Sequence, residues 1–131
     1  MSQLSKLCYI RLFNEKVDEF FKDLIVTFPE VHAFRRFKSG LSLLRSMNEK
    51  TPQKIFKEGM IDKYRKAMLE KDESVFLKGE YVMSKDYYEA YEQWDEFIDM
   101  MKKLWLTLDS ENKEIIWRYF HVMIVLSDKC N

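Results

Sequence analysis

The residue types that most often bind metals or act as nucleophiles are few and scattered in this chain. The two histidines, His32 and His121, and the two cysteines, Cys8 and Cys130, each stand alone in their segments. Zinc sites use closely spaced Cys and His residues, and di-iron bundles use Glu-x-x-His pairs; neither spacing occurs here. We therefore predict no metal site, and we interpret His121, which lies in an apolar stretch, as a core histidine with a hydrogen-bond partner.

Signals for covalent catalysis or phosphate binding are also missing from the sequence. No GxSxG motif surrounds a serine, and with three glycines in 131 residues the chain has no Gly-rich phosphate loop. The sequence therefore predicts no catalytic residue and no cofactor-binding residue. We expect a protein that is not an enzyme and that takes no cofactor.

Charged residues are distributed unevenly, although 22 basic and 22 acidic residues give a formal net charge of zero. Residues 35–71 carry eleven basic and four acidic residues, whereas residues 72–114 carry five basic and twelve acidic residues. Three interpretations stay open: the two regions pair within one molecule, they present oppositely charged surfaces for assembly, or the basic region contacts RNA, DNA or another polyanion. The zero net charge argues against a dedicated, non-specific nucleic-acid binder.

The candidate partner surface combines these charges with tyrosines, which are favoured at interfaces. Acidic residues between positions 89 and 99 recur every three or four positions, a pattern that a solvated helix face also explains. The candidate surface comprises Arg35, Arg36, Lys54, Lys57, Lys63, Arg65, Lys66, Glu89, Glu92, Asp95, Glu96, Asp99, Tyr81 and Tyr88.

Helices must position these residues, because apolar residues recur at helical spacing along most of the chain and only five residues are Gly or Pro. The pattern predicts helices over residues 5–27, 30–47, 51–70, 85–107 and 110–127. Gly59 is predicted to kink or split the third of them. Predicted start signals are a capping box at residues 27–30, Thr51 followed by Pro52, Ser84, and Asp109.

The predicted fold is all-α: one domain over residues 1–131, a bundle of about five helices with the apolar C-terminal helix at its centre. Apolar residues surround the axis of that last helix, which is typical of a central helix or of one that pairs with another copy. The residues predicted to be buried together are Phe20, Leu24, Trp105, Trp117, Phe120 and Ile124.

Two cysteines at opposite ends of the chain indicate free thiols and a reducing compartment. Residues 1–12 contain Lys6 and Arg11 and lack the continuous apolar stretch of a signal peptide. The most apolar stretch, residues 115–126, is too short to span a bilayer, which needs about 20 apolar residues. We expect a soluble, intracellular protein without membrane contact.

Four stretches carry a resemblance to known proteins. They are FNEKVDEFFKDLIVTFPE at 13–30, NEKTPQKIF at 48–56, KDESVFL at 71–77 and SENKEIIWRYFHVMIVLSDK at 110–129. Their pattern resembles small helical proteins encoded by nucleocytoplasmic large DNA viruses of algae and amoebae. The resemblance implies a viral origin, a helical fold, and the host cytoplasm or the virion as the setting, and it transfers no functional residue.

The function expected from the sequence is a non-enzymatic, structural or virion-associated role based on protein–protein contact, either with a protein partner or by self-association. The first alternative is a nucleic-acid- or replication-associated accessory protein that uses the basic residues 35–71. The second is a small regulator that mimics a helical surface of the host.

Overall fold

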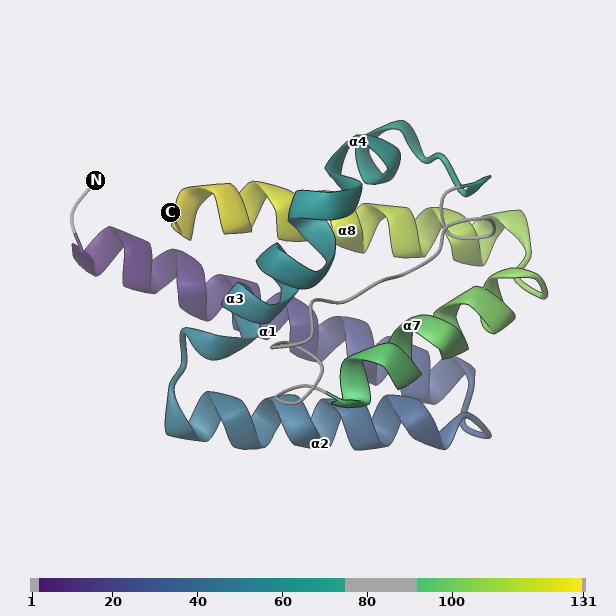
Figure 1. Cartoon of the computed structure of the whole chain (residues 1–131), viewed down its shortest axis with the longest axis horizontal. Coiled ribbons are helices and arrows are strands. Elements are labelled where there is room, and N and C mark those ends of the chain that lie inside the picture. The colour runs from purple at the N-terminus through teal and green to yellow at the C-terminus, as the bar shows by residue number, and fades with distance from the viewer. Residues whose placement is uncertain (1–2, 75–91, 131) are drawn as a thin grey trace.

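The computed structural model describes residues 3–74 and 92–130, and within these ranges the chain is helical without strands (Figure 1). Its elements are α1 (Gln3–Thr27), α2 (His32–Met47), α3 (Thr51–Phe56), η1 (Lys57–Ile61), α4 (Asp62–Glu70), α7 (Glu92–Trp105) and α8 (Ser110–Cys130). α3, η1 and α4 follow one another directly in the chain, so we treat them as one helical segment, which changes its helix type at η1. The predicted all-α bundle of about five helices is confirmed. The C-terminal helix α8 packs extensively on α1, but α1 and not α8 has the central position that the sequence predicted for the last helix.

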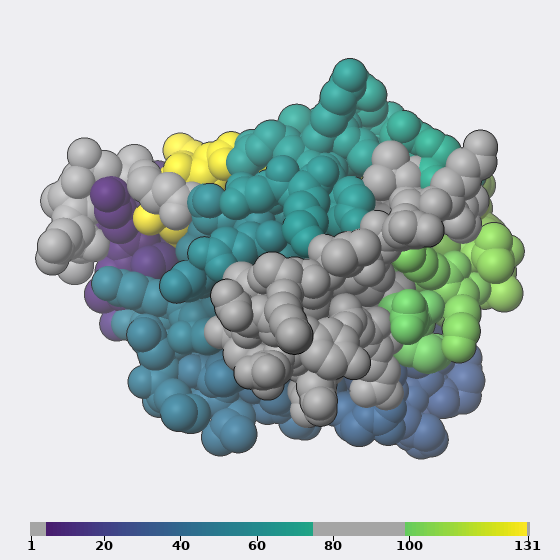
Figure 2. Space-filling view, viewed as in Figure 1, coloured from purple at the N-terminus to yellow at the C-terminus, as the bar shows by residue number. Residues whose placement is uncertain are grey.

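α1 is the helix around which the others are arranged. It runs between α2 and α8, and the α3–η1–α4 segment crosses it (Figure 1). α8 runs antiparallel to α1 and makes the most extensive helix–helix contact among the described residues. On the face seen in Figure 2, the α3–η1–α4 segment covers much of α1 and α8.

One continuous core joins these helices, and it contains the predicted set of residues. α1 buries Phe13, Phe20 and Phe21, each with at most 1 % of its surface exposed. Their rings pack edge-on or tilted against Phe56, Phe120 and Phe37. The joint burial of Phe20, Leu24, Trp105, Trp117, Phe120 and Ile124 is confirmed.

The ends of α1 and α2 and the start of α8 were predicted closely from the sequence. α1 and α2 end at Thr27 and Met47, as expected. The backbone at Asn48 is extended and its Oδ1 accepts a hydrogen bond of 3.0 Å from the Lys50 N–H. At the start of α8, Asp109 Oδ1 accepts a hydrogen bond of 2.8 Å from the Asn112 N–H, so this predicted N-cap is confirmed.

Two predicted start signals are wrong. The capping box at residues 27–30 does not form, because α2 begins at His32 and its N-cap position, Val31, has no side chain able to cap. α3 includes Thr51 as a helical residue, so the N-cap position falls on Lys50, which makes no capping bond. Pro52 nevertheless lies in the first turn, where its missing N–H costs nothing. The predicted start at Ser84 lies outside the described residues.

The break expected at Gly59 is present as η1, a turn of π-helix between α3 and α4. Gly59 itself is buried, together with Met60 and Ile61. A π-turn inserts an extra residue into the helix and so rotates the faces that follow it. α4 contains a further kink at Tyr64, whose backbone is non-helical (φ −121°, ψ 15°), and it packs against α8.

None of the helices in the described part of the chain has the length and apolar composition that crossing a bilayer requires.

Candidate functional site

The basic members of the predicted partner surface are spread over several elements. Arg35 and Arg36 lie exposed on α2, Lys54 lies exposed on α3, and Lys63 and Lys66 lie exposed on α4. The remaining two are half-buried: Lys57 in η1 donates a hydrogen bond of 3.0 Å to Asp62, and Arg65 on α4 pairs with α8.

Arg65 makes the tightest of these pairs. Its Nη1 and Nη2 donate to the two carboxylate oxygens of Asp128 at 2.8 and 2.6 Å, a bidentate arrangement that fixes the contact between α4 and α8. The hydrogen bond from Arg65 lowers the pKa of Asp128. A phosphate that binds to this guanidinium would have to compete with Asp128.

The acidic and tyrosine members are described only in part. Glu92, Asp95, Glu96 and Asp99 lie on α7, and the Asp99 side chain is exposed. Tyr81, Tyr88 and Glu89 lie outside the described residues. α7 packs against α2, so a helix from the acidic region lies beside a helix from the basic region.

Ion pairs between described residues connect the basic region mainly to other parts of the chain. Lys38 pairs with Asp18 at 3.4 Å, and Arg65 pairs with Asp128. Lys71 joins the basic and acidic regions by donating a hydrogen bond of 2.7 Å to Glu114. This bond lowers the pKa of Glu114. Several basic residues in the described part of the chain are therefore engaged in ion pairs with other elements, and the partner surface as a whole stays a prediction.

The outward side of α8 carries a different surface, which we call the outer stripe. α8 buries Ile116, Trp117, Phe120, Met123 and Ile124 in the core. Six exposed residues follow one another at spacings of four, three, four, three and four: Glu111, Ile115, Arg118, Val122, Val125 and Lys129. Three of them are apolar, with exposed fractions of 39 % for Ile115, 39 % for Val122 and 54 % for Val125.

Both edges of the outer stripe are held in place by neighbouring helices. Toward α4, His121 Nε2 lies 2.7 Å from the carbonyl oxygen of Met68, and Asp128 binds Arg65. Toward α1, the Tyr119 hydroxyl donates a hydrogen bond to Asp23, and Lys129 Nζ lies 5.1 Å from the centre of the Tyr9 ring. The outer stripe is thus presented on a rotationally fixed helix. The prediction that His121 has a hydrogen-bond partner is confirmed, but its side chain is half-buried and not part of the core.

An apolar groove of about 170 Å³ adjoins the N-terminal half of the outer stripe. Its walls come from the end of α1, including the exposed Val26, and from Ile115 and Ile116 on α8. Asp23 and Tyr119 supply polar groups in the groove. Burial, together with the hydrogen bond to Asp23, raises the pKa of Tyr119 well above its usual range. The phenol therefore stays neutral at physiological pH.

A wider hollow of about 870 Å³ lies where the start of α1, the α3–η1 segment and the end of α8 meet. Four lysines line it, Lys6, Lys50, Lys54 and Lys57, alongside Glu49 and Glu58. Glu49 is already engaged by Arg11 at 3.1 Å, which lowers the pKa of Glu49. The net charge of the lining is positive.

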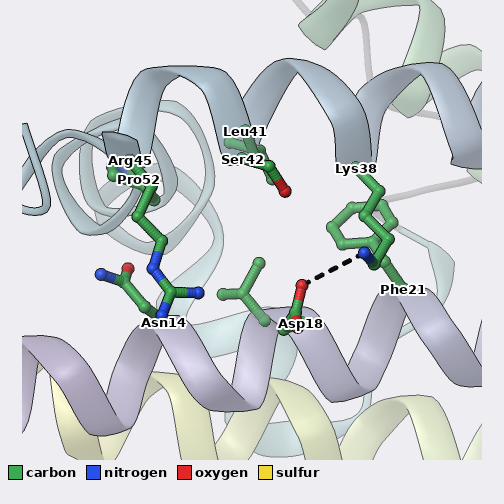
Figure 3. Close-up of a pocket in the computed structure, with 9 residues that line it drawn as sticks. Asn14, Asp18, Phe21, Lys38, Leu41, Ser42, Arg45 and Pro52 are labelled. Carbon is green, nitrogen blue, oxygen red and sulfur yellow. Dashed lines mark ion pairs between the residues drawn. The ribbon is translucent and has the colours of Figure 1, made fainter. Parts of the chain in front are cut away.

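A small polar cleft of about 20 Å³ lies between α1 and α2 (Figure 3). The Asp18–Lys38 ion pair crosses its mouth, and Arg45 extends from α2 toward α1. Asn14 is 3 % exposed and its Nδ2 donates a hydrogen bond of 2.9 Å to the carbonyl of Glu49. Its Oδ1 has no hydrogen-bond partner among the described residues. The cleft holds no more than a water molecule or two.

Groups that could bind a metal do not gather in the described part of the chain. No cluster of three or more His, Cys, Asp or Glu side chains is found there. Cys8 is exposed and Cys130 is buried, and both are free thiols, as predicted. Burial raises the pKa of Cys130, which makes this thiol a poor nucleophile.

No protein-family model, no curated protein and no solved structure matches this chain.

The sequence contained a signal for the outer stripe that the partner-surface prediction did not use. Apolar residues surround the axis of α8, and a bundle helix that is packed on one side leaves the residues on its other side exposed. Ile115 and Val122 are seven residues apart and Val125 follows three residues later, which is the spacing of the a and d positions of paired helices. The predicted partner surface was instead placed within residues 35–99, because charged residues are dense there. Several of those charges form ion pairs within the molecule.

Proposed function

We propose that this protein is a non-enzymatic helical interaction protein that works by packing the outer stripe of α8 against an amphipathic helix. One observation carries the proposal: Ile115, Val122 and Val125 are exposed at coiled-coil spacing on a helix whose two edges are anchored by α1 and α4. Exposed apolar residues scattered singly need no explanation, whereas a regular apolar stripe on a fixed helix is typical of a docking surface.

The resemblance of the sequence to small helical proteins of large DNA viruses directs the search for partners to infected algal or amoebal cells. A structural or virion-associated role would then consist of holding other proteins by helix packing. This mode of binding needs no catalytic group and no cofactor, which agrees with the absence of catalytic motifs from the sequence.

Affinity capture with matched variants tests this proposal. Three baits are compared: the parent chain, the double variant Val122→Glu with Val125→Glu, and the control Leu43→Glu. The control changes an exposed apolar residue of α2, away from the outer stripe. We expect one set of proteins to be captured by the parent and by the control and to be lost with the double variant, because a carboxylate in the stripe has to be desolvated on docking. Equal capture by all three baits would contradict the proposal.

A second candidate function is supported by the lysine-lined hollow near the start of α1. Lys6, Lys50, Lys54 and Lys57 would place positive charge around a polyanion, which is the nucleic-acid alternative in a narrower form. Fluorescence anisotropy with a single-stranded RNA and a single-stranded DNA at about 0.15 M salt distinguishes the two functions. Binding of either nucleic acid at that salt, if the double variant Lys50→Glu with Lys54→Glu abolishes it, would favour the polyanion function over helix docking.

A further inference from the structure

We propose that the helix docked on the outer stripe is α8 of a second copy of this chain, lying antiparallel to the first about a twofold axis beside Phe120. This inference rests on the proposed function, since it names the occupant of the same stripe. A twofold interface must use the same surface on both copies, so the stripe has to be complementary to itself.

The order of residues along the stripe meets that requirement. In an antiparallel pair centred on residue 120, Glu111 of one copy faces Lys129 of the other, and Lys129 faces Glu111. Between these charged ends, Ile115 faces Val125 and Arg118 faces Val122. The Ile115–Val125 contacts therefore lie between two oppositely charged pairs, with the Arg118–Val122 contacts on either side of the twofold axis.

Charge disfavours the parallel arrangement of the same two helices. A parallel pair in register places Glu111 against Glu111, Arg118 against Arg118 and Lys129 against Lys129. All three contacts bring like charges together, and like-charge juxtaposition disfavours a wrong partner or orientation. The stripe thus selects one direction of pairing.

The apolar groove between α1 and α8 supports the same register. Val125 of the second copy comes against Ile115, which forms one wall of the groove. Leu126 is half-buried and lies seven residues after Tyr119, which bonds to α1, and in the second copy it comes level with residue 114, between the groove residues Asn112 and Ile115. The second copy would therefore cover Ile115 and place an aliphatic side chain at the groove, and it would do so twice by symmetry.

The extent of the stripe sets the strength of the pair. Three partly exposed apolar residues per copy form a small interface, at the lower end of the range for specific association. We expect a dimer that dissociates in the micromolar range. Because the two Ile115–Val125 contacts lie inside the charged ends, it should persist at 1 M salt, where the Debye length is about 3 Å.

Sedimentation equilibrium between about 1 and 300 μM tests the pairing, since interfaces of this size dissociate over such concentrations. The parent chain and the control Leu43→Glu should dimerise, and Val122→Glu should remain monomeric while keeping the helical circular dichroism of the parent. A parent chain that stays monomeric throughout overturns the pairing. The affinity-capture result judges the proposed function separately, because it does not depend on which helix occupies the stripe.

A charge exchange tests the antiparallel direction. Glu111→Lys alone turns both terminal contacts into Lys–Lys contacts and should weaken the dimer roughly 10-fold, and Lys129→Glu alone should do the same. The double variant Glu111→Lys with Lys129→Glu recreates both pairs and should return to within about 3-fold of the parent. If either single variant dimerises as tightly as the parent, the antiparallel register is wrong. In a parallel pair residue 111 faces residue 111, so Glu111→Lys would only replace a Glu–Glu contact by a Lys–Lys contact.

Discussion

The indole Nε1 of Trp105, at the end of α7, donates a hydrogen bond of 2.7 Å to Oε2 of Glu73, which follows α4 in the chain. Lys113, in the first turn of α8, donates to the same oxygen at 2.9 Å, and its Nζ lies 5.6 Å from the centre of the Trp105 ring. Three elements therefore meet at one carboxylate. This contact fixes the α7–α8 connection against the end of α4.

Removing the Glu73 carboxylate should destabilise the bundle more than neutralising it. Trp105 is 2 % exposed, so its N–H loses an acceptor in Glu73→Ala that water cannot easily replace. Glu73→Gln keeps an oxygen for Trp105 and loses only the charge that faces Lys113. We expect Glu73→Ala to melt several degrees below Glu73→Gln, measured by circular dichroism at pH 7. Equal melting temperatures for the two variants would show that the hydrogen bond to Trp105 does not contribute.

A buried hydrogen bond joins α3 to the last turn of α8. Gln53 Nε2 donates to Ser127 Oγ at 2.8 Å, and both side chains are buried. Ser127→Ala leaves the amide N–H without this acceptor and should cost about 1–3 kcal/mol. Gln53→Leu with Ser127→Ala removes both polar groups, so its cost should fall at least about 0.5 kcal/mol below the sum of the single variants. Urea denaturation of the four proteins measures this coupling, and additive costs would mean that the two side chains act independently.

Paired carboxylates make stability dependent on pH in a definite direction. Hydrogen bonds from Arg11, Lys71 and Arg65 lower the pKa values of Glu49, Glu114 and Asp128 in the folded state. A lowered folded pKa adds stability that is present above the unfolded value, about 4 for these groups, and is lost as the pH falls through the folded value.

The free energy of unfolding should therefore decline as the pH falls below about 4.5. Urea titrations between pH 7 and pH 3 give this profile. Glu114→Gln, which cannot titrate, should flatten the acid limb relative to the parent. Lys66→Gln, which removes an exposed charge on α4, serves as the matched control. A profile that rises toward low pH would contradict the sign.

Local patterns were sufficient to predict most of this fold. The stripe from Phe13 to Leu24 and the cap at Asp109 depend on neighbours within a turn or two, so the sequence identifies them directly. The predicted capping box failed because other backbone hydrogen bonds form at residues 28–31, and the sequence does not reveal which set of bonds is the more stable. Phe28 continues the α1 ladder by donating its N–H to Leu24, and the Val31 N–H then bonds to Phe28, which delays α2 to His32.

The candidate site was harder to predict because its members acquire their roles from tertiary contacts. Arg65 is one more basic residue in the sequence, and only the packing of α4 on α8 commits it to Asp128. Conversely, Val122 reads as core because its neighbours on α8 are apolar, and it is exposed because α1 and α4 cover the other sides of that helix. The sequence pattern therefore could not show which apolar residues of α8 are exposed.

Alternating sensitivity along α8 should reveal this division into an inner and an outer side. Phe120 is 2 % exposed and contacts the rings of Phe20 and Trp117, so Phe120→Ala should cost about 3–5 kcal/mol through lost burial and a residual cavity. Val122→Ala and Val125→Ala, on the outer stripe, should each change the unfolding free energy by no more than about 0.5 kcal/mol when measured at low protein concentration. Measuring at about 1 μM keeps any micromolar dimer dissociated, so that the monomer alone is compared. A Val122→Ala cost near that of Phe120→Ala would place Val122 in the core and remove the outer stripe as a docking surface.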